Sequence, residues 1–114
     1  MGDLGFMFAS GSKWIKGGYG FWAALVVYNV PNGIGRVEQK VGDGWTSVDD
    51  INWLGQQWSL AEPADYRTAS GSGRTFEVRV SDVSGKPYGT YRVDFPCPDG
   101  SPCGGNTDTS ATRM

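Results

Sequence analysis

The sequence has 114 residues, enough for one domain with one modest hydrophobic core. Charged residues make up 19% of the chain and the formal net charge is −2, and no run of lysine or arginine occurs. Binding to nucleic acid or to an anionic membrane surface is therefore not expected. The absence of histidine excludes Ser-His and Cys-His nucleophile pairs and the common metal-binding clusters, so neither a metal nor a cofactor is expected.

Short apolar and alternating segments, separated by Gly, Asn, Asp and Ser turns, predict β-strands along most of the chain. The longest apolar run, 21–30, is rich in β-branched and aromatic residues and predicts a central strand. Residues 34–41 and 45–48 follow, joined by a hairpin turn at Asp43-Gly44. Two more strands are predicted at 74–81 and 88–95. Because helical periodicity is absent, the pattern favours an all-β sandwich of antiparallel sheets.

Two cysteines, Cys97 and Cys103, bracket a turn-rich spacer and predict a local disulfide, with two free thiols as the alternative. A disulfide indicates an oxidising compartment, and thus a secreted protein of the extracellular space or cell wall. The first residues lack the pattern of a signal peptide, so we interpret the chain as part of a longer secreted protein or as an incomplete gene sequence. For its assembly we expect a monomer or a part of a larger secreted protein. The predicted organisation is an N-terminal segment (1–11), a sandwich (12–96), and a cysteine-bracketed loop with a disordered tail (97–114).

The run 52–58 (NWLGQQW) places two tryptophans in a polar, glycine-containing setting that a buried strand would not use. Exposed aromatic rings suggest a binding face. For Trp58, and also for Trp45 after the hairpin turn, we expect a packing role, because large rings are mostly buried.

Residues from Gly17 to about Asp94 resemble the C-terminal domain of expansins. This is carbohydrate-binding module family 63, shared with the grass-pollen group 2 and group 3 allergens. The resemblance is carried by the order and spacing of four segments: 27–35 (VYNVPNGIG), 44–48 (GWTSV), 52–58 (NWLGQQW) and 75–82 (TFEVRVSD). Two differences are that Leu54 is inserted in the third segment and that the cysteine-containing tail lies outside the family domain.

The resemblance implies an immunoglobulin-like β-sandwich of two antiparallel sheets that binds cellulose through a flat row of aromatic rings. The corresponding positions here are Phe21, Trp22 and Trp53. The apolar faces of a β-1,4-glucan suit the face of an aromatic ring. Adjacent residues of a regular strand point to opposite faces, so Phe21 and Trp22 can both reach the ligand only if the strand entrance is irregular. The glycines at 17, 18 and 20 would permit this.

Around this row, Tyr19 could extend the aromatic platform, and Lys16 and Asn52 could hydrogen-bond glucan hydroxyls at its rim. For each ring the alternative is packing, and for each polar side chain it is simple solvation. Expansins also carry an N-terminal double-psi barrel domain, which this chain does not supply. Wall loosening is therefore not expected from this chain alone.

Catalysis is not expected, although glycoside hydrolysis needs only two carboxylates and Asp49-Asp50 with Asp43 or Asp82 could be nominated. Adjacent carboxylates in a turn are most often solvated, and nothing nearby in the sequence would raise the pKa of one of them for acid catalysis. The sequence thus favours a non-catalytic module that binds cellulose or another neutral β-glucan. The alternative is a protein-binding, immunoglobulin-like adhesion module.

Overall fold

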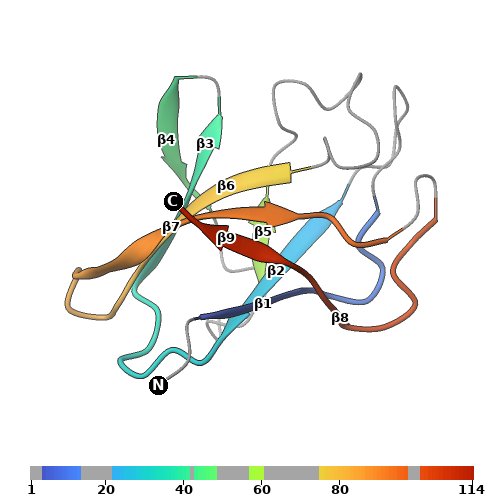
Figure 1. Ribbon diagram of the computed structural model, residues 1–114, viewed down its shortest axis with the longest axis horizontal. Helices are drawn as coiled ribbons and strands as arrows, with labels where there is room; N and C mark the ends of the chain where they lie inside the picture. Colours follow the sequence, from blue (N-terminus) through green and yellow to red (C-terminus); the bar gives the residue numbers. More distant parts are fainter. Residues whose placement is uncertain (1–3, 14–21, 42, 49–56, 61–74, 98–100) are drawn as a thin grey trace.

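The computed structural model describes residues 4–13, 22–41, 43–48, 57–60, 75–97 and 101–114 (Figure 1). Within these residues the chain contains β-strands and no helix, and the strands form two antiparallel sheets that do not close into a barrel. The first sheet has the order β5 (Trp58–Leu60), β2 (Ala23–Tyr28), β1 (Gly5–Phe8) and β8 (Thr107–Asp108). The second has the order β4 (Gly44–Ser47), β3 (Arg36–Val41), β6 (Thr75–Ser81), β7 (Pro87–Asp94) and β9 (Ala111–Arg113).

The core lies between the two sheets and combines aromatic rings with aliphatic side chains. Phe6 on β1 packs against Tyr91 on β7 with ring centroids 5.0 Å apart. Phe8, also on β1, contacts Phe76 on β6 and Phe95 just after β7 at 5.6 and 5.1 Å. These contacts join strands of different sheets, so the predicted sandwich of two antiparallel sheets is confirmed.

Alternation decides which side chains enter this core. On β6, Phe76, Val78 and Val80 are buried, whereas Glu77 and Arg79 between them are only half-buried. This is the pattern that the sequence predicted, because successive residues of a strand point to opposite faces. The runs at 21–30, 34–41, 45–48, 74–81 and 88–95 accordingly overlap β2, β3, β4, β6 and β7.

The sheets also include residues on both sides of the range 12–96 expected for the sandwich. Strand β1 lies between β2 and β8 in its sheet, and two of its four residues, Phe6 and Phe8, are almost fully buried. The tail from Gly104, predicted to be disordered, instead contributes β8 beside β1 and β9 beside β7. Pairing of these short polar strands depends on the backbone groups of the neighbouring strand, which the tail's own composition does not reveal.

No helix among the described ranges has the length and apolar character needed to cross a membrane.

Candidate functional site

Of the residues expected to bind a ligand, the described part of the chain contains Trp22. The others lie outside the described residues: Lys16, Tyr19, Phe21, Asn52 and Trp53. The same holds for the glycines that were expected to make the strand entrance irregular. The candidate site is therefore built here from Trp22 and the residues around it.

The outer face of the five-stranded sheet is charged. The Arg79 Nε donates a hydrogen bond to Glu38 Oε1 at 2.9 Å across β3 and β6, which lowers the pKa of the Glu38 carboxyl. The same guanidinium lies 4.5 Å from the centroid of the Trp45 ring. Trp45 is half-buried on β4, so the predicted packing role is confirmed for this residue.

The outer face of the four-stranded sheet has a different character. Ala23, Leu25 and Val27 of β2 belong to the core, so the alternate residues of this strand face outward. The outward-facing set on β2 and just before it is Trp22, Ala24, Val26 and Tyr28. None of these side chains carries a charge at neutral pH. The rings of Trp22 and Tyr28 are 36% and 37% exposed, which gives this face two accessible aromatic groups.

Tyr28 lies flat on a glycine of the neighbouring strand. Gly5 of β1 pairs with Tyr28, and a Cβ at position 5 would lie within 2.7 Å of three consecutive ring atoms, Cδ2, Cε2 and Cζ. Cε2 and Cζ would be almost equally near to it. If this Cβ lay in the plane of the ring, beyond the Cε2–Cζ edge, its distance to Cδ2 would be distinctly longer. The Cβ would therefore lie over the face of the ring, so this face of Tyr28 covers Gly5. The opposite ring face is then directed away from the sheet.

The hydroxyl of this ring is also held in place. Tyr28 Oη donates a hydrogen bond to Asp108 Oδ1 at 3.1 Å, and Asp108 belongs to β8 on the far side of β1. This bond, then partial burial and the negative charge of Asp108, raise the pKa of the Tyr28 phenol above its ordinary value. The phenol therefore stays protonated and donating at neutral pH.

Trp22 is positioned by a bulge at residues 10–12, shortly after β1, which we call the β1 bulge. The β1–β2 ladder is regular up to the bond from the Ala9 N–H to the Ala24 carbonyl (2.9 Å). Lys13 then pairs with Trp22 in an isolated bridge, with N–H to O distances of 2.6 and 3.1 Å. Three residues, 10–12, thus face one residue of β2, Ala23. The bulge thus lies on the partner strand of Trp22, whereas the irregularity expected at the glycines 17, 18 and 20 falls outside the described residues.

The bulge contains a glycine beneath the tryptophan. Gly11 has a φ of +91°, in the left-handed region that favours glycine. A Cβ there would lie 3.4 Å from Cζ3 and 3.9 Å from Cε3 of Trp22, so the six-membered ring of the indole lies directly beside the bulge. Both accessible rings of this face are therefore placed against a glycine of the β1 segment.

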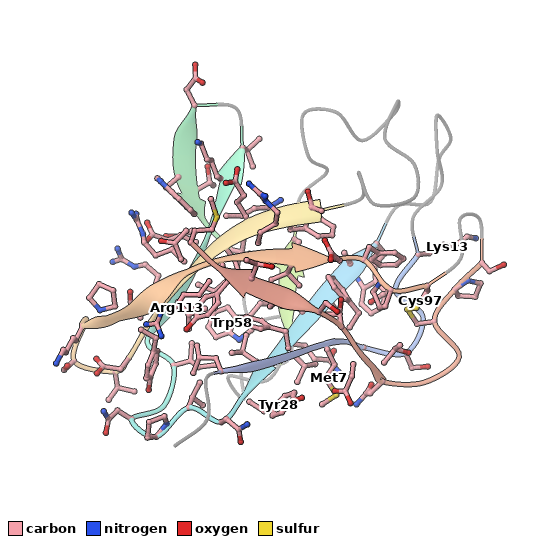
Figure 2. All side chains as sticks on the ribbon, viewed as in Figure 1. Met7, Lys13, Tyr28, Trp58, Cys97 and Arg113 are labelled. Carbon is pink, nitrogen blue, oxygen red and sulfur yellow. A yellow bond between two sulfur atoms is a disulfide. The ribbon has the colours of Figure 1, made fainter. Side chains whose placement is uncertain are left out.

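The predicted disulfide is present and supports this bulge. Cys97 and Cys103 are bonded, with Cα atoms 5.5 Å apart, and both are buried. The Gly11 N–H donates to the Cys103 carbonyl at 2.9 Å, and the Cys103 N–H donates to the Ser12 carbonyl at 2.8 Å. The disulfide loop is thus hydrogen-bonded to the bulge against which Trp22 lies. Figure 2 shows Cys97 and Lys13 at the same end of the molecule.

Trp58, the second tryptophan of the run 52–58, is buried on β5 and belongs to the core. The packing role expected for it is confirmed. Its partner in that run, Trp53, lies outside the described residues.

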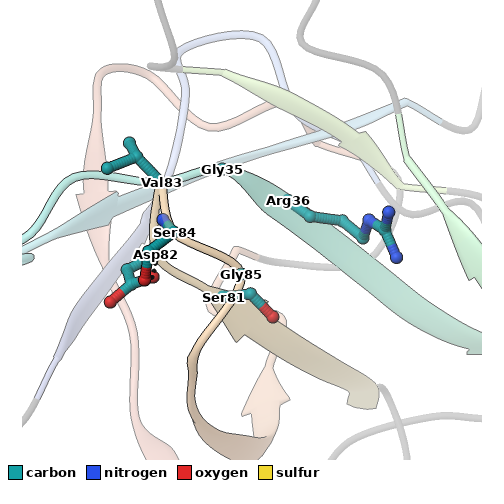
Figure 3. A pocket seen from close by; sticks show the side chains of 7 residues that line it. All are labelled: Gly35, Arg36, Ser81, Asp82, Val83, Ser84 and Gly85. Atoms are coloured by element: carbon teal, nitrogen blue, oxygen red, sulfur yellow. Dashed lines mark hydrogen bonds between the residues drawn. The ribbon is translucent and has the colours of Figure 1, made fainter.

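Among the nominated carboxylates, Asp82 is part of the turn between β6 and β7 and lines an open depression of about 390 Å³ (Figure 3). Asp82 Oδ1 accepts bonds from the Ser84 hydroxyl (2.7 Å), the Ser84 N–H and the Lys86 N–H (both 2.9 Å). The Ser84 hydroxyl first, then the backbone donors, lower the pKa of Asp82. This is the opposite of the shift that an acid catalyst needs at neutral pH.

The other nominated carboxylates add no site. Asp43 is exposed beside the β3–β4 hairpin, and Asp49-Asp50 lies outside the described residues. Within the part of the chain that the structure describes, no group of three or more His, Cys, Asp or Glu side chains could hold a metal ion.

Comparison of the sequence with family models and with curated proteins gave no match. Membership of the expansin C-terminal family thus stays a prediction that depends on the four sequence segments. The sequence reasoning overlooked Tyr28 as a surface aromatic. Its signal was present, because Tyr28 lies an even number of residues after Trp22 on one predicted strand.

Proposed function

We propose that this chain is a secreted, non-catalytic carbohydrate-binding module that binds cellulose or a related neutral β-glucan. The observation that carries the proposal is the position of Trp22, which is accessible on the outer face of the four-stranded sheet, beside the uncharged outward side chains of β2, and lies next to Gly11 in the β1 bulge. The segments shared with expansin C-terminal domains support the same ligand class.

The physical argument starts from the ligand. The hydroxyls of a β-1,4-glucan are equatorial, so both faces of each sugar ring are apolar C–H surfaces that stack on aromatic rings. A neutral polymer offers no charge to pair with, and the Trp22 face contributes little charge of its own. The charged outer face, by contrast, has Glu38, Arg79 and Trp45 already engaged with one another. Of the two outer faces, that of Trp22 is therefore the better match to a neutral polysaccharide.

Depletion on insoluble cellulose, at low and at high salt, tests the proposal. We expect the native chain to be retained equally in both, because stacking is not screened by ions. Trp22→Ala should lose most of this retention. Trp45→Ala is the matched control, since it removes the same kind of ring from the opposite outer face, and it should be retained like the native chain. Thermal unfolding should establish that each variant is folded.

Failure of the native chain to bind cellulose, or equal retention of Trp22→Ala, would contradict the proposal. Retention that falls steeply with salt would point to charge pairing in place of stacking. The native chain should then be tested on other polysaccharides and on protein partners of an adhesion module.

A further inference from the structure

We propose that Tyr28 is a second stacking position, so that the ligand is an extended chain of several sugar rings running along β2. This inference rests on the proposed function and makes it more specific. It assigns a length and a direction to the ligand, and a binding role to a residue that the sequence analysis placed only in a motif.

The first step is the orientation of the ring. Tyr28 covers Gly5 with one face, and Asp108 holds its hydroxyl at 3.1 Å. The ring is thus fixed on both its apolar and its polar side while remaining 37% exposed. An aromatic ring held flat on a sheet, with its free face accessible, loses little conformational freedom when a sugar stacks on it.

The second step is the spacing. Trp22 and Tyr28 are six residues apart along one strand and face the same side, which corresponds to roughly 20 Å at the rise of a β-strand. Figure 2 shows Tyr28 at one end of the four-stranded sheet and Lys13, the bridge partner of Trp22, at the other. A sugar ring is about as wide as a benzene ring, so a disaccharide cannot stack on both side chains, whereas a longer oligosaccharide can.

The third step is the surface between the rings. Val26 and its neighbour Met7 are half-buried and apolar there, whereas Ala24 is fully buried and offers no surface to a ligand. The accessible surface between the rings thus includes two uncharged side chains, and the carboxylate of Asp108 beside Met7 is hydrogen-bonded by the Tyr28 hydroxyl. A straight, neutral polymer is the ligand whose shape matches two flat rings set in line along a strand.

Calorimetric titration with cellobiose and with cellohexaose tests this inference. We expect the native chain to bind cellohexaose at least about tenfold more tightly than cellobiose, which corresponds to about 1.4 kcal/mol. Tyr28→Ala should remove most of this dependence on length. Tyr28→Phe should keep it, because the ring and its contact with Gly5 remain and only the bond to Asp108 is lost.

Gly5→Ala provides an independent test that leaves Tyr28 unchanged. The added methyl group cannot coexist with the present ring position, so the ring must leave the face of β1 and the dependence on length should fall as in Tyr28→Ala. Val83→Ala, at an exposed side chain of the β6–β7 turn, is the control and should bind like the native chain. Unfolding curves should show that all the variants are folded.

Two results separate the inference from the function it rests on. If Trp22-dependent cellulose retention persists but the native chain binds both oligosaccharides equally, or Tyr28→Ala keeps the native preference, the inference is overturned and the proposed function stands. If the native chain binds neither cellulose nor the oligosaccharides, the function fails and the inference fails with it.

Discussion

The buried hydroxyl of Ser12 accepts a hydrogen bond from the backbone N–H of Ala24 at 3.1 Å. Both residues are fully buried. The bulge at 10–12 interrupts the β1–β2 ladder at this point, and a side-chain oxygen takes the place of a ladder carbonyl. The bulge that positions Trp22 therefore leaves the buried N–H of Ala24 with a hydrogen-bond acceptor.

Ser12→Ala should destabilise the fold by about 1–3 kcal/mol, because it leaves the buried Ala24 N–H without its acceptor. Chemical denaturation of the two proteins measures the difference. Ser10→Ala is the matched control, since the exposed Ser10 bonds Asn106 through its backbone N–H, and it should be close to neutral. Similar stabilities for Ser12→Ala and the native chain would show that water or a backbone shift replaces the hydroxyl.

Removing the disulfide should reduce both stability and ligand binding. In the chain-entropy picture this short loop contributes roughly 2–3 kcal/mol to the free energy of unfolding. Because Cys103 is hydrogen-bonded to Gly11 and Ser12, a looser loop should also loosen the support of Trp22. A double Cys97→Ser/Cys103→Ser variant should thus unfold at lower denaturant and be retained less on cellulose. Unchanged retention of a folded double variant would mean that the bulge holds its shape without the bond.

Asp82 should make the stability depend on pH in the acid range. Its pKa is lowered in the folded state relative to an ordinary value of about 3.9, chiefly by the Ser84 hydroxyl and then by backbone donors. Because the pKa of Asp82 is lower in the folded than in the unfolded state, this carboxyl stabilises the fold at pH values above its unfolded pKa. The contribution is lost as the pH falls through the folded-state pKa.

Melting temperatures between about pH 7 and about pH 2 test this expectation, which follows from the same linkage. Asp82→Asn should be less stable than the native chain at neutral pH, and the difference should shrink on acidification. Ser84→Ala should show an intermediate profile. Parallel curves for the native chain and Asp82→Asn across the whole range would rule out the assigned role of Asp82.

Trp58→Phe should be far better tolerated than Trp58→Ala. The indole Nε1 of Trp58 is buried and has no hydrogen-bond partner among the described residues, which is unfavourable in itself. Phenylalanine keeps most of the apolar ring and removes this donor, so we expect a change within about 1–2 kcal/mol. Alanine should cost about 3–5 kcal/mol through the cavity that it leaves. Equal losses for both variants would indicate that the N–H is satisfied in solution.

The sequence predicted the strands whose own residues alternate. β6 and β3 follow directly from the pattern of 74–81 and 34–41, because one face of each is apolar. β1 was overlooked because it has only four residues and begins with a glycine, which weakens a strand signal. That glycine is required by the ring of Tyr28 on the next strand, β2, which is a tertiary contact that the residues of β1 do not reveal. β8 and β9 were overlooked because their polar side chains have no periodicity to detect.

The candidate site was predicted in part. Trp22 followed from the resemblance, and its exposure agrees with a surface role. The bulge in β1 could not be predicted, because it depends on bonds from Gly11 and Ser12 to Cys103, which are tertiary contacts without a local pattern. The disulfide was predictable because its two cysteines are close in sequence with turn residues between them.

Strands β8 and β9 belong to different sheets although only Thr109 and Ser110 separate them. Each lies along an otherwise open side of its sheet, β8 beside β1 and β9 beside β7. A chain cut before Thr107 would present the unpaired N–H and C=O groups of β1 and β7 to other molecules, which is the usual template for edge-to-edge aggregation. The two short polar strands of the C-terminal segment thus cover one edge of each sheet with main-chain hydrogen bonds.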